Sequence, residues 1–324
     1  MFSENKNVAA LIVTYNRQNL LIECLAAVKE QAFTPSTIVV IDNASTDGTD
    51  GLFADGGIFD GDPNIVYCRM KENLGGAGGF KEGIRKCMDL GCDWVWLMDD
   101  DCIARPDTLS SLMDAAEAST RYGAEPSFLA SSVYGPQGEA MNVPVVDTRA
   151  DANGYPDWYR ALAEGMVEIE SATFVSLLIN RRAIEQLGLP IADFFIWGDD
   201  TEYTTRLTHY FGPAYMVGTS KVLHKRANAK SLDIRNENDP IRIANFHRLY
   251  KNNLVVKKYH YGNKAAVKTV LVNIKNAFSC LAKGGDAMEL RFARFRAIIV
   301  GVFEFVAHRY ELEDLECALG RGRA

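Results

Sequence analysis

The sequence lacks the features of a membrane-spanning, disulfide-bonded or zinc-binding protein. No apolar run approaches the roughly 20 residues that cross a bilayer, and the polar first residues do not resemble a signal peptide. The seven cysteines are scattered and lack the spacing of paired metal ligands. There is no internal repeat and no low-complexity tract. These absences predict a cytoplasmic globular protein whose thiols are reduced and buried.

The net charge of −7 conceals two regions of opposite sign. Residues 1–220 carry 15 basic and 32 acidic side chains, whereas residues 221–310 carry 18 basic and 6 acidic ones. This difference indicates that the two regions meet different partners. On charge alone, an anionic membrane surface, a phosphorylated lipid or a nucleic acid would fit the basic region. A helical appendage that packs on the rest of the chain or on a second copy is an equal alternative.

Short apolar strands alternate with amphipathic helical segments over the first third of the chain. The segments 8–14, 37–41 and 94–98 are apolar at nearly every position, as in strands that are buried on both faces of a sheet. This alternation predicts an α/β fold with a mostly parallel sheet flanked by helices. We expect one further strand over residues 169–179 and two or three basic, amphipathic helices over residues 240–310.

Three consecutive carboxylates follow the strand at 94–98. Asp99, Asp100 and Asp101 therefore lie at the carboxyl end of a buried strand, where open α/β sheets bind their ligands. Neighbouring carboxylates repel one another unless a cation joins them, and carboxylates suit Mg²⁺ or Mn²⁺. Taken alone, the triplet also fits a solvated acidic turn.

Two other stretches follow strands on the same predicted edge. Asp42, after the strand at 37–41, has the chemistry to bind a base or a ribose, and equally to cap the next helix. The glycine-rich stretch 73–79 lacks the spacing of a dinucleotide fingerprint. It fits a helix N-terminus whose amides face a negatively charged ligand, or a tightly packed turn between strand and helix.

A second acidic cluster opens a helix near residue 200. Asp199 and Glu202 have the spacing of a capping box, which is the structural role that we favour for both. Asp200 then lies in the first turn beside Trp197, where its carboxylate is suited to accept a proton from a sugar hydroxyl while the indole stacks on the sugar. His224 follows a strand, and a lone histidine is more often structural than a ligand.

The order of these motifs resembles the inverting family 2 glycosyltransferases of the GT-A fold. The motifs lie, in this order, at residues 14–17, 42–49, 73–76, 99–101, 197–202 and 224. Within that family, residues 73–80 and 93–101 are most similar to bacterial galactofuranosyltransferases that build cell-envelope polysaccharide. The resemblance covers residues 8–226. It implies a GT-A catalytic domain over residues 1–228 and a basic, mostly helical C-terminal region over residues 229–324.

The resemblance also implies a role for each motif residue. The general base would be Asp200. The pocket for the donor nucleotide would contain Thr14, Arg17, Asp42, Asn73 and Asp100. Acceptor contacts would come from Trp197, Asp199 and Glu202. The divalent metal, Mn²⁺ or Mg²⁺, would be held by Asp99, Asp101 and His224. The ligand role of His224 is thus implied by the resemblance alone, because the local sequence favoured a structural role.

The implied activity is the transfer of galactofuranose from UDP-galactofuranose, with inversion, to a lipid-linked glycan at the cytosolic face of the membrane. The nearest alternative is a rhamnosyltransferase that uses dTDP-rhamnose. A metal-dependent phosphohydrolase or nucleotidyltransferase is a second class, although no glycine–arginine loop follows the first strand. A non-catalytic member of a polysaccharide-assembly complex is a third, against which the intact carboxylates argue. The resemblance implies no nucleic-acid partner and leaves a homo-oligomer open.

Overall fold

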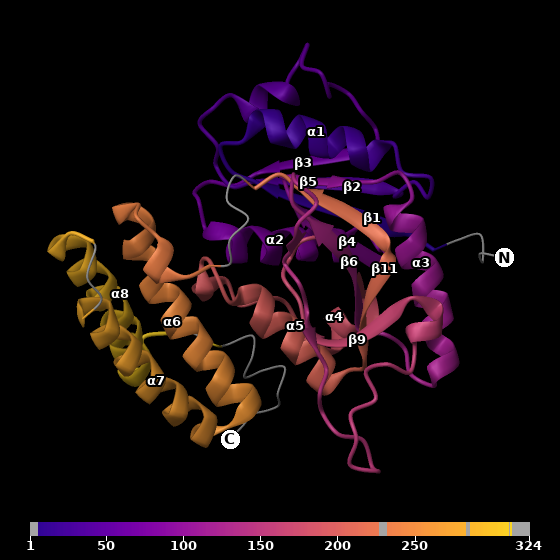
Figure 1. Cartoon of the computed structure of the whole chain (residues 1–324). Coiled ribbons are helices and arrows are strands. Elements are labelled where there is room, and N and C mark those ends of the chain that lie inside the picture. The colour runs from indigo at the N-terminus through magenta and orange to yellow at the C-terminus, as the bar shows by residue number, and fades with distance from the viewer. Residues whose placement is uncertain (1–5, 227–231, 283–285, 311, 313–324) are drawn as a thin grey trace.

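The computed structural model describes residues 6–226, 232–282, 286–310 and 312, and shows one large sheet between helices (Figure 1). The described strands are β1 Val8–Thr14, β2 Thr37–Asp42, β3 Ile65–Arg69, β4 Trp94–Asp99, β5 Cys102–Ala104, β6 Phe128–Tyr134, β7 Ala140–Met141, β8 Val145–Val146, β9 Met166–Ser171, β10 Leu177–Asn180 and β11 Ala214–His224. The described α-helices are α1 Gln18–Lys29, α2 Gly75–Asp89, α3 Thr108–Ser119, α4 Arg181–Leu187, α5 Asp199–Tyr210, α6 Pro240–Tyr261, α7 Asn263–Ala282 and α8 Met288–Val306. Short 3-10 helices lie at Thr49–Leu52, Thr120–Tyr122, Leu162–Glu164, Ala192–Phe194 and Ile234–Asn236.

The strands follow the order β3-β2-β1-β4-β10-β6-β11-β9-β8, with β5 paired to β11 and β7 to β6. β1 runs parallel to both of its neighbours, β2 and β4. β10 is antiparallel to both β4 and β6, so that β6 and its parallel partner β11 continue the direction of β4. The α/β fold with a mixed, mostly parallel sheet is therefore confirmed, and the carboxyl ends of β1, β2 and β4 share one edge.

The continuous apolar character of β1 follows from helices on both faces of the sheet. Its alternate residues Val8, Ala10 and Ile12 pack in one cluster with residues of α1 and α3. The intervening Ala9, Leu11 and Val13 pack in a second cluster with residues of α2, α4 and α5. All seven residues of β1 are buried. The described cysteines are free, and all of them except Cys68 are buried, as predicted.

The single strand expected over residues 169–179 is wrong, because the chain forms two strands there. β9 pairs with β8 and β11, whereas β10 pairs with β4 and β6, so the chain leaves one part of the sheet and enters another between them. Ser176 adopts a left-handed backbone (φ 58°) in this break. The Thr204 hydroxyl bonds both the N–H and the C=O of Ala172 there, at 3.1 Å each. The sequence of this stretch does not reveal such a change of partner.

The three helices α6, α7 and α8 lie together beside α5 and α2 (Figure 1). α6 begins at Pro240 because the Asp239 side chain accepts the N–H of Ile241, and it ends before Gly262, whose φ of 88° leaves the helical region. The predicted helices over 240–310 are thus present, while the domain boundary at residue 228 stays a prediction. Among the described helices, none has the length and apolar content needed to cross a membrane.

Candidate active site

The ends of β1 and β4 bring Thr14, Arg17 and the aspartate triplet together. The Thr14 hydroxyl donates to Asp100 Oδ2 at 2.7 Å. Arg17 Nη1 donates to Asp100 Oδ1 at 3.2 Å and to Asp101 Oδ2 at 2.8 Å, while half of its side chain stays exposed. The triplet is therefore not a solvated acidic turn, since Asp100 and Asp101 are buried and form ion pairs with the Arg17 guanidinium.

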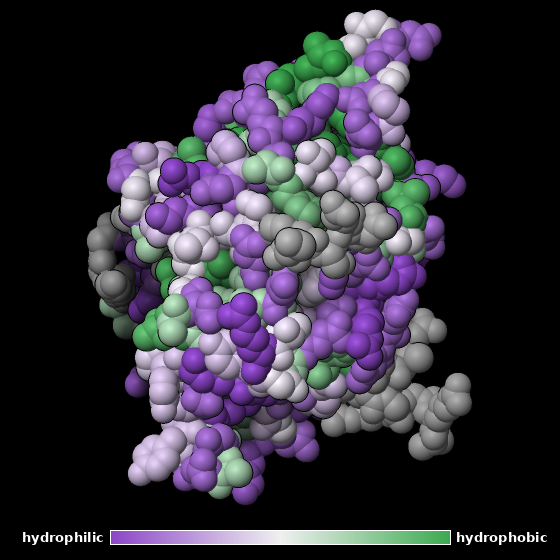
Figure 2. Space-filling view, turned by 90° about the vertical axis from the view of Figure 1, so that its right-hand side faces the viewer, coloured by the Kyte–Doolittle hydropathy of each residue, from purple (hydrophilic) through white to green (hydrophobic). Residues whose placement is uncertain are grey.

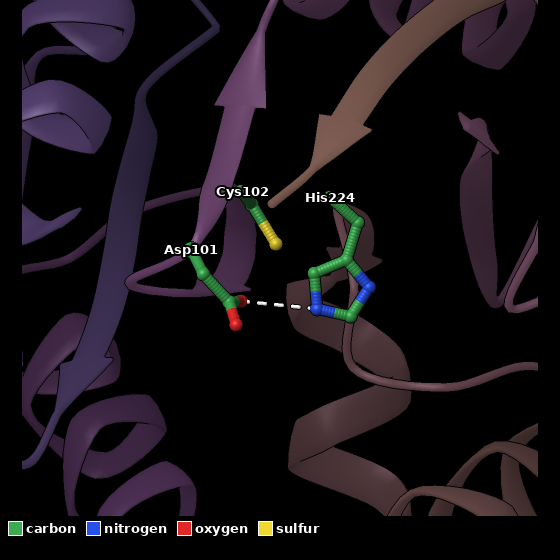
Figure 3. Close-up of side chains that lie close together, drawn as sticks. All are labelled: Asp101, Cys102 and His224. Atoms are coloured by element: carbon green, nitrogen blue, oxygen red, sulfur yellow. Dashed lines mark ion pairs between the residues drawn. The ribbon is translucent and has the colours of Figure 1, made fainter. Parts of the chain in front are cut away.

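His224 joins this cluster through the pairing of β5 with β11. The register places His224 opposite Cys102, next to Asp101. His224 Nε2 lies 3.0 Å from Asp101 Oδ1 (Figure 3). On the other side of the ring, Nδ1 lies 2.9 Å from Asn142 Oδ1, and the Asn142 amide donates to Thr173 Oγ1. Asn142 belongs to the long segment 134–165, where no local sequence signal marked it.

The cluster of Asp101, Cys102 and His224 suits a divalent cation. One ligand atom from each of these buried residues lies within 4.8 Å of the others. Because Asn142 Oδ1 only accepts, His224 Nδ1 carries a hydrogen. Nε2 then faces Asp101 Oδ1 either with a second proton, as an ion pair, or with a lone pair that a cation can bind. Apart from this contact with His224, the buried Asp101 Oδ1 has no hydrogen-bond partner within the described residues. A cation between these two atoms would satisfy both.

The thiol of Cys102 is a poor ligand for such a cation. Burial and the charge of Asp99 raise its pKa well above the ordinary value, and soft sulfur suits hard cations such as Mn²⁺ or Mg²⁺ less well than oxygen or nitrogen does. The remaining oxygen and nitrogen ligands fit Mn²⁺ or Mg²⁺. Asp99 does not belong to this compact group, and its role at the metal stays a prediction.

The carboxylates of the triplet differ in their pKa values. Burial, followed by the charges of Asp101 and Asp100, raises the pKa of Asp99 well above its ordinary value. Burial raises the pKa of Asp100 to about 6 against the opposing charge of Arg17. For Asp101 the effect of burial is outweighed by His224 and Arg17, so that its pKa is lowered. Asp101 is thus the carboxylate of this cluster most readily ionised.

The candidate residues of the nucleotide pocket are held by polar contacts of their own. Asp42 is buried, and its oxygens accept from Tyr67 Oη at 2.6 Å and from the N–H of Ser45 at 2.8 Å. It therefore caps the turn that follows β2 rather than a helix. Asn73 Oδ1 accepts the N–H of Gly75 at 2.8 Å. Direct contacts of Asp42 and Asn73 with a nucleotide stay predictions.

The glycines of the 73–79 stretch serve tight packing. Gly75 has a φ of 72°, and a Cβ there would lie 2.0 Å from the Phe195 carbonyl oxygen. The same oxygen accepts the N–H of Ala77 in the first turn of α2, at 3.1 Å. A Cβ at Gly79 would lie 2.6 Å from the Val13 side chain. Of the two interpretations of this stretch, the structure favours the packed turn.

The capping box at the start of α5 is wrong. The N-cap residue is Gly198, with a φ of 95°, and Asp199 already lies within the helix. Glu202 is fully buried in the first turn of this helix, and its contact with an acceptor stays a prediction. Its carboxylate pairs with Arg206 at 2.7 Å and with His260 of α6 at 3.0 Å. No local sequence pattern predicts the pairing of Glu202 with His260.

Asp199 and Asp200 lie in different surroundings despite being adjacent. Asp199 is buried, and burial together with the charge of Asp200 raises its pKa to about 8. Asp200 is only partly buried, and its Oδ1 accepts the N–H of Thr201 at 2.6 Å. Burial raises the pKa of Asp200 too. Asp199 is also among the charges that raise the pKa of Asp99, so the two acidic clusters lie within electrostatic range of each other.

Trp197 is partly exposed and packs on the C-terminal region. Its ring centroid lies 4.9 Å from that of Phe246 on α6. One side of the indole is thereby occupied, and stacking of a sugar on the other stays a prediction.

Comparison with known proteins identifies the family. Residues 9–140 match the model of glycosyl transferase family 2. The chain is 30% identical over 263 residues to the galactofuranosyltransferase GlfT1 of Mycolicibacterium smegmatis, an alignment that covers 79% of this chain and 81% of the relative. The chain belongs to glycosyl transferase family 2. This membership makes the protein a glycosyltransferase and excludes the phosphohydrolase and nucleotidyltransferase alternatives.

Two further similarities extend over nearly the whole glycosyltransferase. The dTDP-rhamnosyl transferase RfbF of Shigella flexneri is 22% identical, over 92% of this chain and 96% of the relative. The solved structure of the mannosyltransferase PcManGT from Pyrobaculum calidifontis, in complex with GDP-Man and Mn²⁺, matches with a TM-score of 0.53 and 17% identity, over 95% of this chain and 89% of that one. The expected GT-A fold is therefore confirmed for this glycosyltransferase.

Proposed function

We propose that this glycosyltransferase moves galactofuranose from UDP-galactofuranose, with inversion, to a lipid-linked glycan. The observation that carries the sugar assignment is the 30% identity with GlfT1 over most of both chains. The site suits this chemistry, because Asp101 Oδ1 and His224 Nε2 lie 3.0 Å apart and Asp200, a partly exposed carboxylate, lies in the first turn of α5. The rhamnosyl relative is more distant, at 22% identity.

In this proposal Asp101 and His224 hold Mn²⁺ or Mg²⁺, with Asp99 as the further ligand. When bound, the cation neutralises the diphosphate of the donor as a Lewis acid. Arg17, half exposed between Asp100 and Asp101, adds positive charge beside the departing group. Thr14 fixes Asp100 in the orientation that Arg17 requires.

Asp200 is the general base of the proposed reaction. Its carboxylate accepts the proton of the acceptor hydroxyl, the oxygen of that hydroxyl bonds to the anomeric carbon, and the bond from that carbon to the diphosphate breaks on the opposite face. UDP leaves with the bonding electrons and the anomeric centre is inverted. The raised pKa of Asp200 brings it closer to neutral pH and makes it a stronger base. Asp199 contacts the acceptor in its protonated form.

The donor assignment is tested by offering UDP-galactofuranose, UDP-galactopyranose and dTDP-rhamnose separately, each with Mn²⁺ and a saccharide acceptor bearing a lipid chain. We expect glycoside formation with UDP-galactofuranose and a kcat/KM at least about tenfold lower with the others. Faster transfer from dTDP-rhamnose would overturn the galactofuranose assignment in favour of the rhamnosyl alternative.

The basic C-terminal helices bind the cytosolic surface of an anionic membrane in this proposal. α7 exposes an apolar stripe at Val267, Leu271 and Phe278, whose side chains are 57–63% exposed. The stripe continues onto α8, since the ring of Phe278 lies 5.4 Å from that of Phe295. Lysines at 264, 268 and 275 share α7 with the stripe, and an apolar stripe beside basic residues suits an anionic lipid surface. The side of the molecule away from these helices shows its hydrophobic residues in small, separate groups (Figure 2).

The membrane contact is tested by flotation with vesicles of phosphatidylglycerol and phosphatidylcholine. We expect binding that rises with the anionic fraction, weakens with salt and falls in a Leu271→Glu, Phe278→Glu variant. Val145→Glu, at an exposed valine on β8, is the matched control. Binding that ignores lipid charge, or a stable dimer that the double substitution dissociates, would replace the membrane by another partner.

A further inference from the structure

The segment that leads into the catalytic helix α5 has an unfavourable backbone. Phe195 and Trp197 have φ values of 60° and 62°, a left-handed conformation that bulky side chains rarely adopt. Gly198 follows with a φ of 95°. Such a conformation persists only where surrounding contacts hold it, and it occurs directly before Asp199 and Asp200.

A single side chain of α6 donates to three backbone carbonyl groups of this segment. Asn252 is fully buried, and its Nδ2 lies 3.1 Å from the carbonyl oxygen of Phe194, 3.3 Å from that of Ile196 and 2.7 Å from that of Trp197. All three atoms only accept, so the amide nitrogen must face them. The Phe194 carbonyl also accepts the N–H of Ile196, whereas without Asn252 the carbonyl groups of Ile196 and Trp197 would lose this donor.

Other residues of α6 contact the same segment. The Arg248 guanidinium lies 4.3 Å from the centre of the Phe195 ring, and Lys251 Nζ lies 3.1 Å from Asp193. On the opposite side, the first turn of α2 donates the N–H of Ala77 to the Phe195 carbonyl. The segment 193–198 is therefore clamped between α2 and α6, which lie on either side of the start of α5 (Figure 1).

We propose that Asn252 is a positioning residue for the catalytic carboxylate. By fixing the carbonyl groups of residues 194–197, it sets where α5 begins and hence where Asp200 meets the acceptor hydroxyl. The inference rests on the proposed role of Asp200 as the base. It makes the C-terminal region a part of the active site, and not merely an appendage that contacts other partners.

The test replaces the amide donor by an oxygen of the same size. In Asn252→Asp, an oxygen faces three carbonyl oxygens, which disfavours the present backbone of residues 194–197. We expect kcat to fall roughly 10–100-fold, since small misplacements of catalytic groups have effects of that order. The affinity for UDP with Mn²⁺, measured by calorimetry, should stay within about twofold because the metal cluster lies on other elements. Asn245→Asp is the control, because Asn245 lies on the same helix and, among the described residues, its side chain donates to the Ile241 carbonyl of that helix and not to the segment 193–198.

A spectroscopic measurement separates this inference from the assignments of donor and base. The protein labelled with 5-fluorotryptophan gives a ¹⁹F resonance for Trp197, which Trp197→Phe assigns. We expect that resonance to shift or broaden in Asn252→Asp and to remain unchanged in Asn245→Asp, whichever donor the enzyme uses. A folded Asn252→Asp protein with an unchanged resonance and a kcat within twofold of the original would overturn the proposal.

A second variant covers the case in which Asn252→Asp does not fold. Lys251→Met removes the partly buried ion pair with Asp193 and leaves Asn252 in place. We expect a several-fold lower kcat, an unchanged affinity for UDP with Mn²⁺ and a smaller shift of the Trp197 resonance. A wild-type kcat and spectrum in this variant would count against the clamp. Transfer activity of Asp200→Asn, measured in parallel, reports separately on the base.

Discussion

Asp101 and Asp199, one from each acidic cluster of this protein, are the same residue type in opposite surroundings. In the first, Asp101 lies against Arg17 and His224, and these partners lower its pKa despite its burial. In the second, Asp199 is buried beside Asp200, and its pKa is raised to about 8. Asp101 is therefore held in its ionised form, which a cation can use, whereas Asp199 keeps its proton up to a higher pH.

In the proposed reaction, this difference separates two tasks. Stabilising a departing diphosphate requires a carboxylate that stays ionised around a metal, and neighbouring positive groups provide for that. Taking a proton from a hydroxyl requires a carboxylate whose pKa is near neutral, and burial without a cationic partner provides for that. Substitutions in the two clusters should therefore affect different steps.

The largest effect is expected from removing the base. Asp200→Asn should lower kcat for transfer by roughly 10²–10⁴-fold, because the amide accepts no proton from the acceptor hydroxyl. The affinity for UDP with Mn²⁺ should remain as in the original protein. Turnover of labelled donor and calorimetry measure the two quantities. Near-normal turnover would show that the second cluster has no catalytic role.

The reverse pattern is expected for the first cluster. Asp101→Ala should weaken Mn²⁺-dependent binding of UDP by more than the roughly 10–100-fold typical of residues that only support a ligand. Calorimetric titration with UDP in Mn²⁺ and in EDTA measures this change. An unaltered titration would refute the metal site, and the two clusters would then no longer differ in function.

A smaller effect is expected one contact further from the metal. Asn142→Ala removes the acceptor that keeps the hydrogen on His224 Nδ1, so Nε2 is no longer fixed toward Asp101. We expect the affinity for Mn²⁺ to fall roughly 10-fold. Asn153→Ala, at an exposed asparagine of the same long segment, is the control. If Asn142→Ala and Asn153→Ala bound Mn²⁺ with equal affinity, the hydrogen bond to Asn142 would not be needed to orient His224.

The smallest effect concerns stability and its dependence on pH. Because the pKa of Asp199 in the folded protein is about 8, its carboxyl stabilises the fold while protonated, and this contribution is lost as the pH rises toward 8. Asp199→Asn should therefore stabilise the metal-free protein more at pH 8 than at pH 5, by at least about 1.4 kcal/mol, the equivalent of one pKa unit. Thermal unfolding at both pH values measures it, with exposed Asp55→Asn as the baseline. An equal gain in the free energy of unfolding at both pH values would show that the pKa of Asp199 is not raised, and the contrast with Asp101 would be lost.

The sequence by itself determined the parts of the site that follow a strand. Uniformly apolar segments identified β1, β2 and β4, and parallel strands place their following residues on one edge. The proximity of Thr14, Arg17 and the aspartate triplet was therefore predictable from local pattern. The start of α5 was located to within a residue, although its cap was not.

Only the tertiary structure decided which carboxylates are paired and which are desolvated. The register of β5 against β11 brings His224 to Asp101, packing turns Glu202 inward to His260, and α6 places Asn252 under the strained segment. Each of these contacts joins residues far apart in the chain, and each depends on which surfaces pack together. Periodicity records how one segment is buried, and it carries no information on the partner that buries it.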